Sequence, residues 1–151
     1  MNALITAGFI ELLGQLTKVG DVTREQFLER FAAMKQRGCY YVTIIEDVAL
    51  GRIIGAATLV VEHKFIHGCG LRGHLEDVVV NDTYRGRQLG KLIVTTINLL
   101  AREVGCYKIT LECKASLVKM YSSFGYVREE NGSHNSMNLR FEDQAFLRNK
   151  I

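Results

Sequence analysis

The chain has 151 residues, 48% of them hydrophobic and 23% charged, which fits one globular domain with a substantial core and excludes a second full domain. A net charge of +3 and a pI near 8.7 are compatible with a small polyanionic ligand. They fall short of the dense basic clustering of nucleic-acid-binding proteins, so we expect no nucleic-acid partner.

The four cysteines include no C-x-x-C pair and have no histidines at zinc spacing, which indicates reduced thiols and no bound metal. No segment approaches the roughly 20 apolar residues that a membrane span needs. The first residues lack the basic leader and cleavage pattern of a secretory signal. We therefore expect a cytoplasmic protein without a transmembrane segment.

The chain begins with two candidate helices. Apolar residues from Phe9 to Leu16 are compatible with a first helix, although the pattern is ambiguous. Thr23, followed three residues later by Gln26, forms a capping box. It predicts a second helix that ends at Gly38.

Three strands are predicted next, from runs rich in β-branched and aromatic residues. They cover residues 40–45, 52–61 and 75–80, and a turn over 46–51 joins the first two. Between the second and third strands, residues 64–73 combine glycines with cationic side chains. This composition is typical of a functional loop.

Helices and strands then alternate. The predicted elements are a helix that includes Leu92 and stops at Gly105, a strand over 107–113, a short helix over 114–124, a strand begun by 126–127, a polar turn over 129–135 and a last strand over 137–141. A meander followed by β-α-β-α-β predicts an α/β (α+β) fold, with one mixed central sheet flanked by helices. The ligand site is expected at the carboxyl ends of the central strands.

An anion site is predicted between Glu76 and Leu92, where a strand, a glycine-bearing turn and a helix start follow one another. The first N–H groups of a helix lack intrahelical partners and carry partial positive charge, so they stabilise a phosphate. The spacing fits neither a Walker loop nor the G-x-G-x-x-G fingerprint. An ordinary strand-to-helix turn with solvated arginines is the alternative.

The residues of this turn resemble the acyl-CoA-binding signature of the GNAT superfamily of N-acetyltransferases: Arg85, Gly86, Arg87, Gln88, Leu89 and Gly90. Gln88 departs from that signature, which usually has glycine there. Further segments look like the eukaryotic glucosamine 6-phosphate N-acetyltransferases: Glu76 with Asp77, residues 105–113, Met120 with Tyr121, and residues 124–126. The resemblance extends over about residues 16–141.

This resemblance implies a single N-acetyltransferase domain over residues 1–151. Its members transfer the acetyl group of acetyl-CoA to the amino group of D-glucosamine 6-phosphate, by direct attack in a ternary complex. The products are CoA and N-acetyl-D-glucosamine 6-phosphate, a precursor of UDP-N-acetylglucosamine. The family also implies a homodimer whose substrate pocket borders the partner subunit, with acetyl-CoA as co-substrate and no metal.

The resemblance also assigns the cofactor site. The backbone of Val78, Val79 and Val80 is expected to pair with the pantetheine arm, and residues 85–90 to hold the pyrophosphate. Tyr121 is expected to face the CoA sulfur and protonate the leaving thiolate, with core packing as the alternative. Leu117 stands where the family commonly has a CoA-contacting asparagine, so that contact is missing or comes from a neighbour such as Ser116.

Two carboxylates compete for the role of general base. We expect Glu112 to accept the amine proton, directly or through a water, with Glu76 as the rival. Solvated strand ends are the alternative for both. The resemblance implies this set of substrate-binding residues: Thr17, Lys64, Phe65, Ile66, His67, Glu76, Asp77, Val78, Tyr107, Lys108, Glu112 and Arg140.

Two rival functions stay open at this point. One is acetyl transfer to another small amine or to a protein lysine, which would not need the cations Lys64, His67 and Arg140. The other is a non-catalytic acyl-CoA-binding module. Such a module would need neither Tyr121 nor Glu112.

Overall fold

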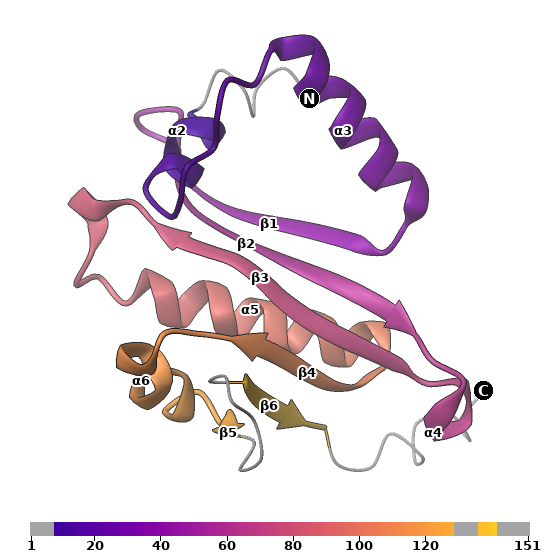
Figure 1. The fold of residues 1–151 in the computed structure, drawn as a ribbon. Coiled ribbons are helices and arrows are strands. Elements are labelled where there is room, and N and C mark those ends of the chain that lie inside the picture. Colours follow the sequence, from indigo (N-terminus) through magenta and orange to yellow (C-terminus); the bar gives the residue numbers. More distant parts are fainter. Residues whose placement is uncertain (1–7, 129–135, 142–151) are drawn as a thin grey trace.

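The computed structural model describes residues 8–128 and 136–141. Its centre is a six-stranded sheet in the order β1-β2-β3-β4-β6-β5 (Figure 1). The strands are β1 (Tyr40–Asp47), β2 (Arg52–His63), β3 (Leu71–Val80), β4 (Cys106–Glu112), β5 (Val127–Arg128) and β6 (Ser136–Arg140). Neighbouring strands are antiparallel except β3 and β4, which are parallel. The predicted mixed sheet flanked by helices is therefore confirmed.

The helices are α2 (Phe9–Gly14), α3 (Arg24–Arg37), α4 (Ile66–Cys69), α5 (Leu89–Val104) and α6 (Val118–Ser122), with short 3-10 turns η1 (Asp82–Tyr84) and η2 (Ala115–Leu117). The capping box is confirmed, because Gln26 N–H donates to Thr23 Oγ1 at 3.2 Å and Thr23 N–H donates to Gln26 Oε1 at 2.9 Å. None of the helices in the described residues has the length and apolar character that a membrane crossing requires.

Helix α5 begins at Leu89, inside the segment where a helix start was predicted, so the last residues of the anion turn belong to its first turn. Two predicted boundaries were wrong. The short helix predicted over 114–124 is divided into η2 and α6. It ends early because the N–H groups of Phe124 and Tyr126 both bond to the Tyr121 carbonyl around a turn. The polar turn predicted over 129–135 lies outside the described residues.

The second correction concerns the loop predicted over 64–73, whose last residues open strand β3. Leu71 pairs with His63 and Gly73 with Val61. A Cβ at Gly73 would lie 2.9 Å from Cδ1 of Leu59, so this glycine allows close packing inside a strand. It does not mark a turn.

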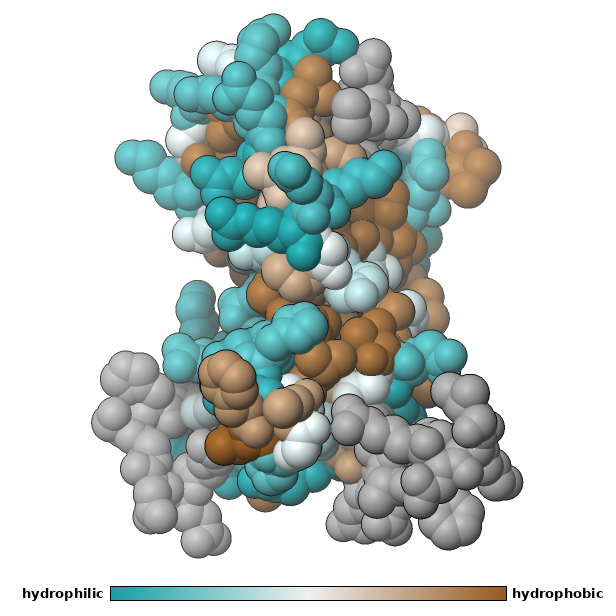
Figure 2. Space-filling view, turned by 90° about the vertical axis from the view of Figure 1, so that its right-hand side faces the viewer, coloured by the Kyte–Doolittle hydropathy of each residue, from teal (hydrophilic) through white to brown (hydrophobic). Residues whose placement is uncertain are grey.

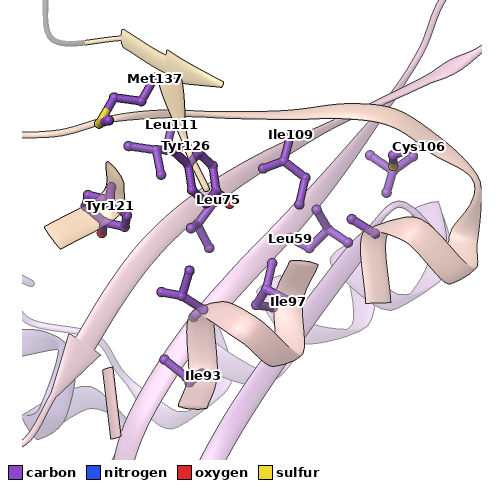
Figure 3. Packing of buried hydrophobic residues seen from close by; sticks show 14 residues of the cluster. Leu59, Leu75, Ile93, Ile97, Cys106, Ile109, Leu111, Tyr121, Tyr126 and Met137 are labelled. Atoms are coloured by element: carbon purple, nitrogen blue, oxygen red, sulfur yellow. The ribbon is translucent and has the colours of Figure 1, made fainter. Parts of the chain in front are cut away.

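The main core lies between α5 and the sheet (Figure 3). Ile93 and Ile97 of α5 are buried against Leu59, Leu75 and Ile109 of the three central strands. Burying a side chain of this size stabilises a fold by about 1.5–3 kcal/mol. A smaller cluster, formed by Leu12, Ile53, Ala56 and Val79, lies under α2 on the other face of the sheet. The sheet is thus fixed from both sides where β2 and β3 run together.

Helix α3 is less deeply packed than its apolar pattern predicts. Phe27 is buried and its ring centroid lies 6.3 Å from that of Phe31, but Leu28, Phe31 and Met34 are only half-buried. Val42, on the neighbouring edge strand β1, is also exposed. Figure 2 shows brown, apolar atoms at the surface between the upper and lower parts of the molecule.

Candidate active site

The two parallel strands at the centre of the sheet separate into a fork. Their ladder runs from Leu71, paired with Cys106, to His74, paired with Thr110, and the described residues give no later pair between them. Strand β3 stays paired with β2 as far as Val80. The edge of β3 that faces β4 beyond the fork is therefore open to an extended ligand, which can bind as an added strand.

A β-bulge at Asp77 accompanies this fork. Thr58 of β2 pairs with Glu76 and Ala56 pairs with Val79, so two residues of β3 lie opposite one residue of β2. Asp77 has φ 52°, the left-handed conformation that a bulge of this kind requires. The bulge reverses the alternation of side chains, and Val79 consequently joins the cluster under α2.

A cleft of about 640 Å³ opens at the carboxyl end of β3, as expected for a parallel strand pair. It is lined by residues from α2, β3, the turn after it, the start of α5 and the α6 region. They are Gln15, Leu16, Val78, Val79, Val80, Tyr84, Arg85, Gly86, Gln88, Leu89, Gly90, Lys91, Leu117, Met120, Tyr121, Ser123 and Phe124. Most of the predicted cofactor residues therefore share one cleft.

The N-terminus of α5 forms one wall of this cleft. Its first intrahelical hydrogen bond runs from Leu92 N–H to the Gln88 carbonyl at 3.0 Å, so the N–H groups of Leu89, Gly90 and Lys91 have no helical acceptor. Gln88 itself has φ 59° and ψ 17°. It adopts the backbone conformation that suits glycine, so the departure from the family signature leaves the turn intact.

The two glycines of the turn leave space beside these donors. A Cβ added at Gly86 or Gly90 would meet no heavy atom within 4 Å. Packing within the described residues therefore does not require glycine at position 90, which has ordinary helical backbone geometry. The vacant space lies where a phosphate bound at the helix start would approach.

Three cations surround the turn. Arg85 forms an ion pair with Asp82, and the guanidinium carbon of Arg87 lies 5.0 Å from the centre of the Tyr84 ring. Lys91, in the first turn of α5, also lines the cleft. Lys91 was not predicted from the sequence, although its position one residue after the glycine signature is a signal that could have identified it.

The turn is tied to two other parts of the fold. The Tyr84 hydroxyl donates to Oδ2 of Asp47 at 2.5 Å. This bond lowers the pKa of the Asp47 carboxyl and raises that of the Tyr84 phenol. Asp82 N–H donates to Oε1 of Gln15 at 2.9 Å, which connects the turn to the end of α2. The turn that carries the predicted pyrophosphate-binding residues 85–90 is thus held by hydrogen bonds to β1 and to the end of α2.

Tyr121 is one of the residues that line the cleft and is only 6% exposed. Its ring packs edge-on against Phe124 at 6.3 Å and Tyr126 at 5.9 Å. Burial raises the pKa of its phenol to about 12, so the hydroxyl keeps its proton at neutral pH. Core packing and a proton-donor role are therefore compatible in one side chain.

The two candidate bases lie beyond the fork, one on each strand. Glu76 and Glu112 are both exposed. Partial burial is the main cause that raises the pKa of Glu76, and the charges of Asp77 and Glu112 raise it further. This electrostatic coupling indicates that the carboxylates share one region. Neither lies among the described residues that line the cleft.

The remaining predicted substrate residues lie elsewhere. Lys64, Phe65, Ile66 and His67 are in or beside α4, and the His67 and Tyr107 rings are 4.1 Å apart. Lys108 pairs with Arg140 toward the start of β4, whereas Glu112 is the last residue of that strand. Figure 1 shows α4 and α6 at opposite ends of the central strands. One protomer therefore keeps His67, Lys108 and Arg140 toward the opposite end of β4 from Glu112, whereas the Lys64 ammonium contacts Glu62, whose carboxylate also contacts His74 at the fork. Thr17 follows the cleft residue Leu16.

Leu117 lines the cleft at the start of α6 and is 37% exposed. Ser116, the expected replacement for its missing polar contact, is exposed and is not among the lining residues that the structure describes. Ser123 lies in the lining instead. No set of three or more His, Cys, Asp or Glu side chains in the described residues is arranged to hold a metal ion.

Known proteins resemble this chain in sequence and in fold. The acetyltransferase (GNAT) family matches residues 9–126. A Drosophila melanogaster protein named "Probable glucosamine 6-phosphate N-acetyltransferase" is 60% identical over 93% of this chain and 64% of its own length. Glucosamine 6-phosphate N-acetyltransferase 1 of Dictyostelium discoideum is 43% identical over 81% of this chain and 78% of its own length.

The fold agrees with these sequence matches. The crystal structure of glucosamine-6-phosphate N-acetyltransferase from Arabidopsis thaliana superposes with a TM-score of 0.82, at 36% identity, covering 92% of each chain. This chain spans 64% of the length of its Drosophila relative and most of the length of the others. It belongs to the acetyltransferase (GNAT) family, in the branch that its glucosamine 6-phosphate N-acetyltransferase relatives form.

Proposed function

We propose that this chain transfers the acetyl group of acetyl-CoA to the amino group of D-glucosamine 6-phosphate, giving N-acetyl-D-glucosamine 6-phosphate and CoA. The observation that carries the proposal is the fork between β3 and β4. The cleft beside the fork contains the anion turn at the start of α5 and the buried hydroxyl of Tyr121. The carboxylates of Glu76 and Glu112, which interact electrostatically, follow the fork on its two strands. The names of the relatives supply the substrate.

The open edge of β3 supports binding of acetyl-CoA. The amide groups of the pantetheine arm would bond to the backbone of Val78 to Val80 in the manner of an added strand. The N–H groups at the start of α5 would hold the pyrophosphate, with Lys91 of the cleft lining as one charge partner. Arg87, whose guanidinium lies over the ring of the lining residue Tyr84, would be a second. The space beside Gly86 and Gly90 fits this arrangement, since an anion there would meet no side chain at either position.

The chemistry needs one proton acceptor and one proton donor. The amine nitrogen attacks the thioester carbon, and a carboxylate, Glu112 in our proposal, accepts the proton that the nitrogen loses. The tetrahedral intermediate then collapses, the carbon–sulfur bond breaks and the thiolate takes a proton from the Tyr121 hydroxyl. Solvent carries the proton from the carboxylic acid back to tyrosinate. Glu76 would orient the amine.

A second copy of the chain would complete the sugar site. His67, Lys108 and Arg140 lie toward the far end of β4 from Glu112, so they would serve the fork of a partner in a homodimer. Phe65 is 98% exposed and Ile66 is 60% exposed, which gives α4 an apolar surface suited to such a contact. The tan and brown atoms of this end of the molecule are visible in Figure 2.

Thiol release from acetyl-CoA tests the reaction, with glucosamine 6-phosphate compared against glucosamine and glucose 6-phosphate. We expect release only when both the amine and the phosphate are present, with glucosamine much slower. Equal rates with and without the phosphate would reject the sugar phosphate as substrate. They would favour transfer to another amine. No release with any amine, together with tight acetyl-CoA binding, would favour a binding module.

Subunit mixing tests the shared site. His67→Ala disables the α4 end and Glu112→Gln disables the fork, so each variant alone should be nearly inactive. After random reassortment, half of the dimers are mixed and each mixed dimer has one intact site of two, which predicts about a quarter of the wild-type activity. No recovery, in a sample shown to have exchanged subunits, would place each site within one protomer.

A further inference from the structure

The point where β3 and β4 separate is held by polar side chains on the face of the sheet opposite α5. His74 and Thr110 form the last pair of the parallel ladder. Thr110 Oγ1 lies 3.3 Å from Nδ1 of His74, and Nη2 of Arg72 donates to the same oxygen at 3.1 Å. Thr110 is only 4% exposed. The final ladder pair is thus linked through side chains as well as through the backbone.

Strand β2 anchors this cluster from the other side. Nε2 of His74 lies 3.0 Å from Oε2 of Glu62, and Nζ of Lys64 lies 2.5 Å from Oε1 of the same carboxylate. The hydrogen bonds from Lys64 and His74 lower the pKa of Glu62 to about 2, so it is charged at neutral pH. The contacts therefore extend over three strands, from β2 through β3 to β4.

The two carboxylates of the fork follow directly. Glu76 comes two residues after His74, and Glu112 comes two residues after Thr110. Because strand residues two apart share a face, each carboxylate lies on the same side of the sheet as the cluster. The charged groups around His74 are Glu62 from β2 with its partner Lys64, Arg72 and Glu76 from β3, and Lys108 and Glu112 from β4.

We propose that His74 and Thr110 are positioning residues for acetyl transfer, which fix where β3 and β4 separate and so set the spacing of Glu76 and Glu112. This inference rests on the proposed function. Neither residue is among the described residues that line the cleft, so both would act through the carboxylates. A displacement of about 1 Å at a reacting group can lower a rate by about 10²-fold, which makes this spacing decisive.

Three threonine variants test the proposal. Thr110→Val removes the hydroxyl at nearly constant volume, Thr110→Ser restores it, and Thr43→Val makes the same change on β1, away from the fork. We expect Thr110→Val to lower kcat by about 10- to 100-fold while the Kd for acetyl-CoA stays within about twofold. Thr110→Ser should recover most of kcat, and Thr43→Val should retain it. Equal losses of Tm in both valine variants with unchanged kcat would overturn the proposal.

A second measurement separates this proposal from the proposed function. Carbon-13 NMR of the Glu side-chain carboxyls follows the titration of Glu76 without any turnover. If the fork loosens in Thr110→Val, Glu76 gains solvent and its titration midpoint should fall toward the ordinary glutamate value. An unchanged Glu76 midpoint in Thr110→Val would overturn the positioning role, whatever amine the enzyme acetylates.

Discussion

The Tyr84 hydroxyl donates a 2.5 Å hydrogen bond to Oδ2 of Asp47, which joins the anion turn to the end of β1, 37 positions earlier in the chain. The ring of the same tyrosine lies against the Arg87 guanidinium. Loss of this bond should let the turn move away from the start of α5. It therefore bears on cofactor binding more than on the chemical step.

Asp47→Ala and Tyr84→Phe should each raise the Kd for acetyl-CoA by about fivefold, which corresponds to roughly 1 kcal/mol for one hydrogen bond. At saturating acetyl-CoA, kcat should be unchanged. Isothermal titration of the single and double variants measures this. If the bond is the cause, the double variant should be no weaker than either single one. Additive losses would show that the two side chains act separately, and Glu46→Ala is the matched control.

Gly90→Ala should have opposite effects on stability and on binding. Alanine is favoured over glycine in a helix by about 0.8–1 kcal/mol, and the added Cβ meets no protein atom within 4 Å, so Tm should rise. The same methyl group would occupy the space reserved for the pyrophosphate and should weaken acetyl-CoA binding at least tenfold. Calorimetry of the free and liganded protein measures both. A gain in Tm without loss of affinity would show that the phosphate binds elsewhere.

Gln88→Gly should stabilise the protein. The left-handed conformation costs an ordinary residue about 1–2 kcal/mol, and glycine adopts it without that strain. Part of the gain is offset by the greater freedom of glycine in the unfolded chain. Gln36→Gly, in the last turn of α3, is the control and should lower stability, because its backbone is helical. Urea unfolding of the two variants should give shifts of opposite sign, and shifts of the same sign would contradict the strain at Gln88.

Tyr121→Phe should lower kcat by about 10²-fold with little change in acetyl-CoA affinity, since it removes the proton donor but keeps the ring. Tyr126→Phe is the matched control. It removes another buried hydroxyl, which donates to Asn98 Oδ1 at 2.6 Å, and should lower stability by about 1–2 kcal/mol without loss of kcat. Because the pKa of Tyr121 is about 12, its titration should not limit kcat below about pH 11. Normal turnover of Tyr121→Phe would remove it from the mechanism.

Glu112→Gln should lower kcat by about 10²- to 10⁴-fold, whereas Glu76→Gln should lower it less. The charge of Glu112 helps to raise the pKa of Glu76, so its removal should lower that pKa. If Glu76 were the base, Glu112→Gln would stay active and the acid limb of kcat/KM would move to lower pH. Profiles of kcat/KM against pH for both variants, with Glu103→Gln on α5 as the control, distinguish these outcomes.

Much of the fold follows from local patterns. The capping box, the parallel strand pair joined by α5 and the anion turn were all predicted, because each depends on residues close together in the sequence. The structure added two details of the anion turn that the sequence did not predict: the empty space beside Gly90 and the left-handed backbone of Gln88. The opening of strand β3 was missed because Gly73 was interpreted as a turn residue, whereas it accommodates Leu59 from the neighbouring strand.

The candidate site was less predictable where it depends on distant contacts. Gln15 reaches the cleft only because α2 packs on the sheet, and no motif indicates its bond to Asp82. Similarly, Arg140 and Glu112 belong to one predicted substrate set, yet the register of β6 on β4 pairs Arg140 with Lys108 rather than with Glu112. A family resemblance identifies the residues of a substrate site, but it does not give the distances between them within one folded protomer.

The extra residue at Asp77 changes which residues of β3 face α5. Before the bulge every second residue, such as Leu75, faces α5, and after the bulge the even-numbered Val78 faces α5 while Val79 faces α2. Deleting this one residue would turn Val79 away from the cluster under α2 and shift every later side chain by half a repeat. Substitutions at position 77 can be absorbed locally, but the strand can change its length only in steps of two residues if its two cores are to survive.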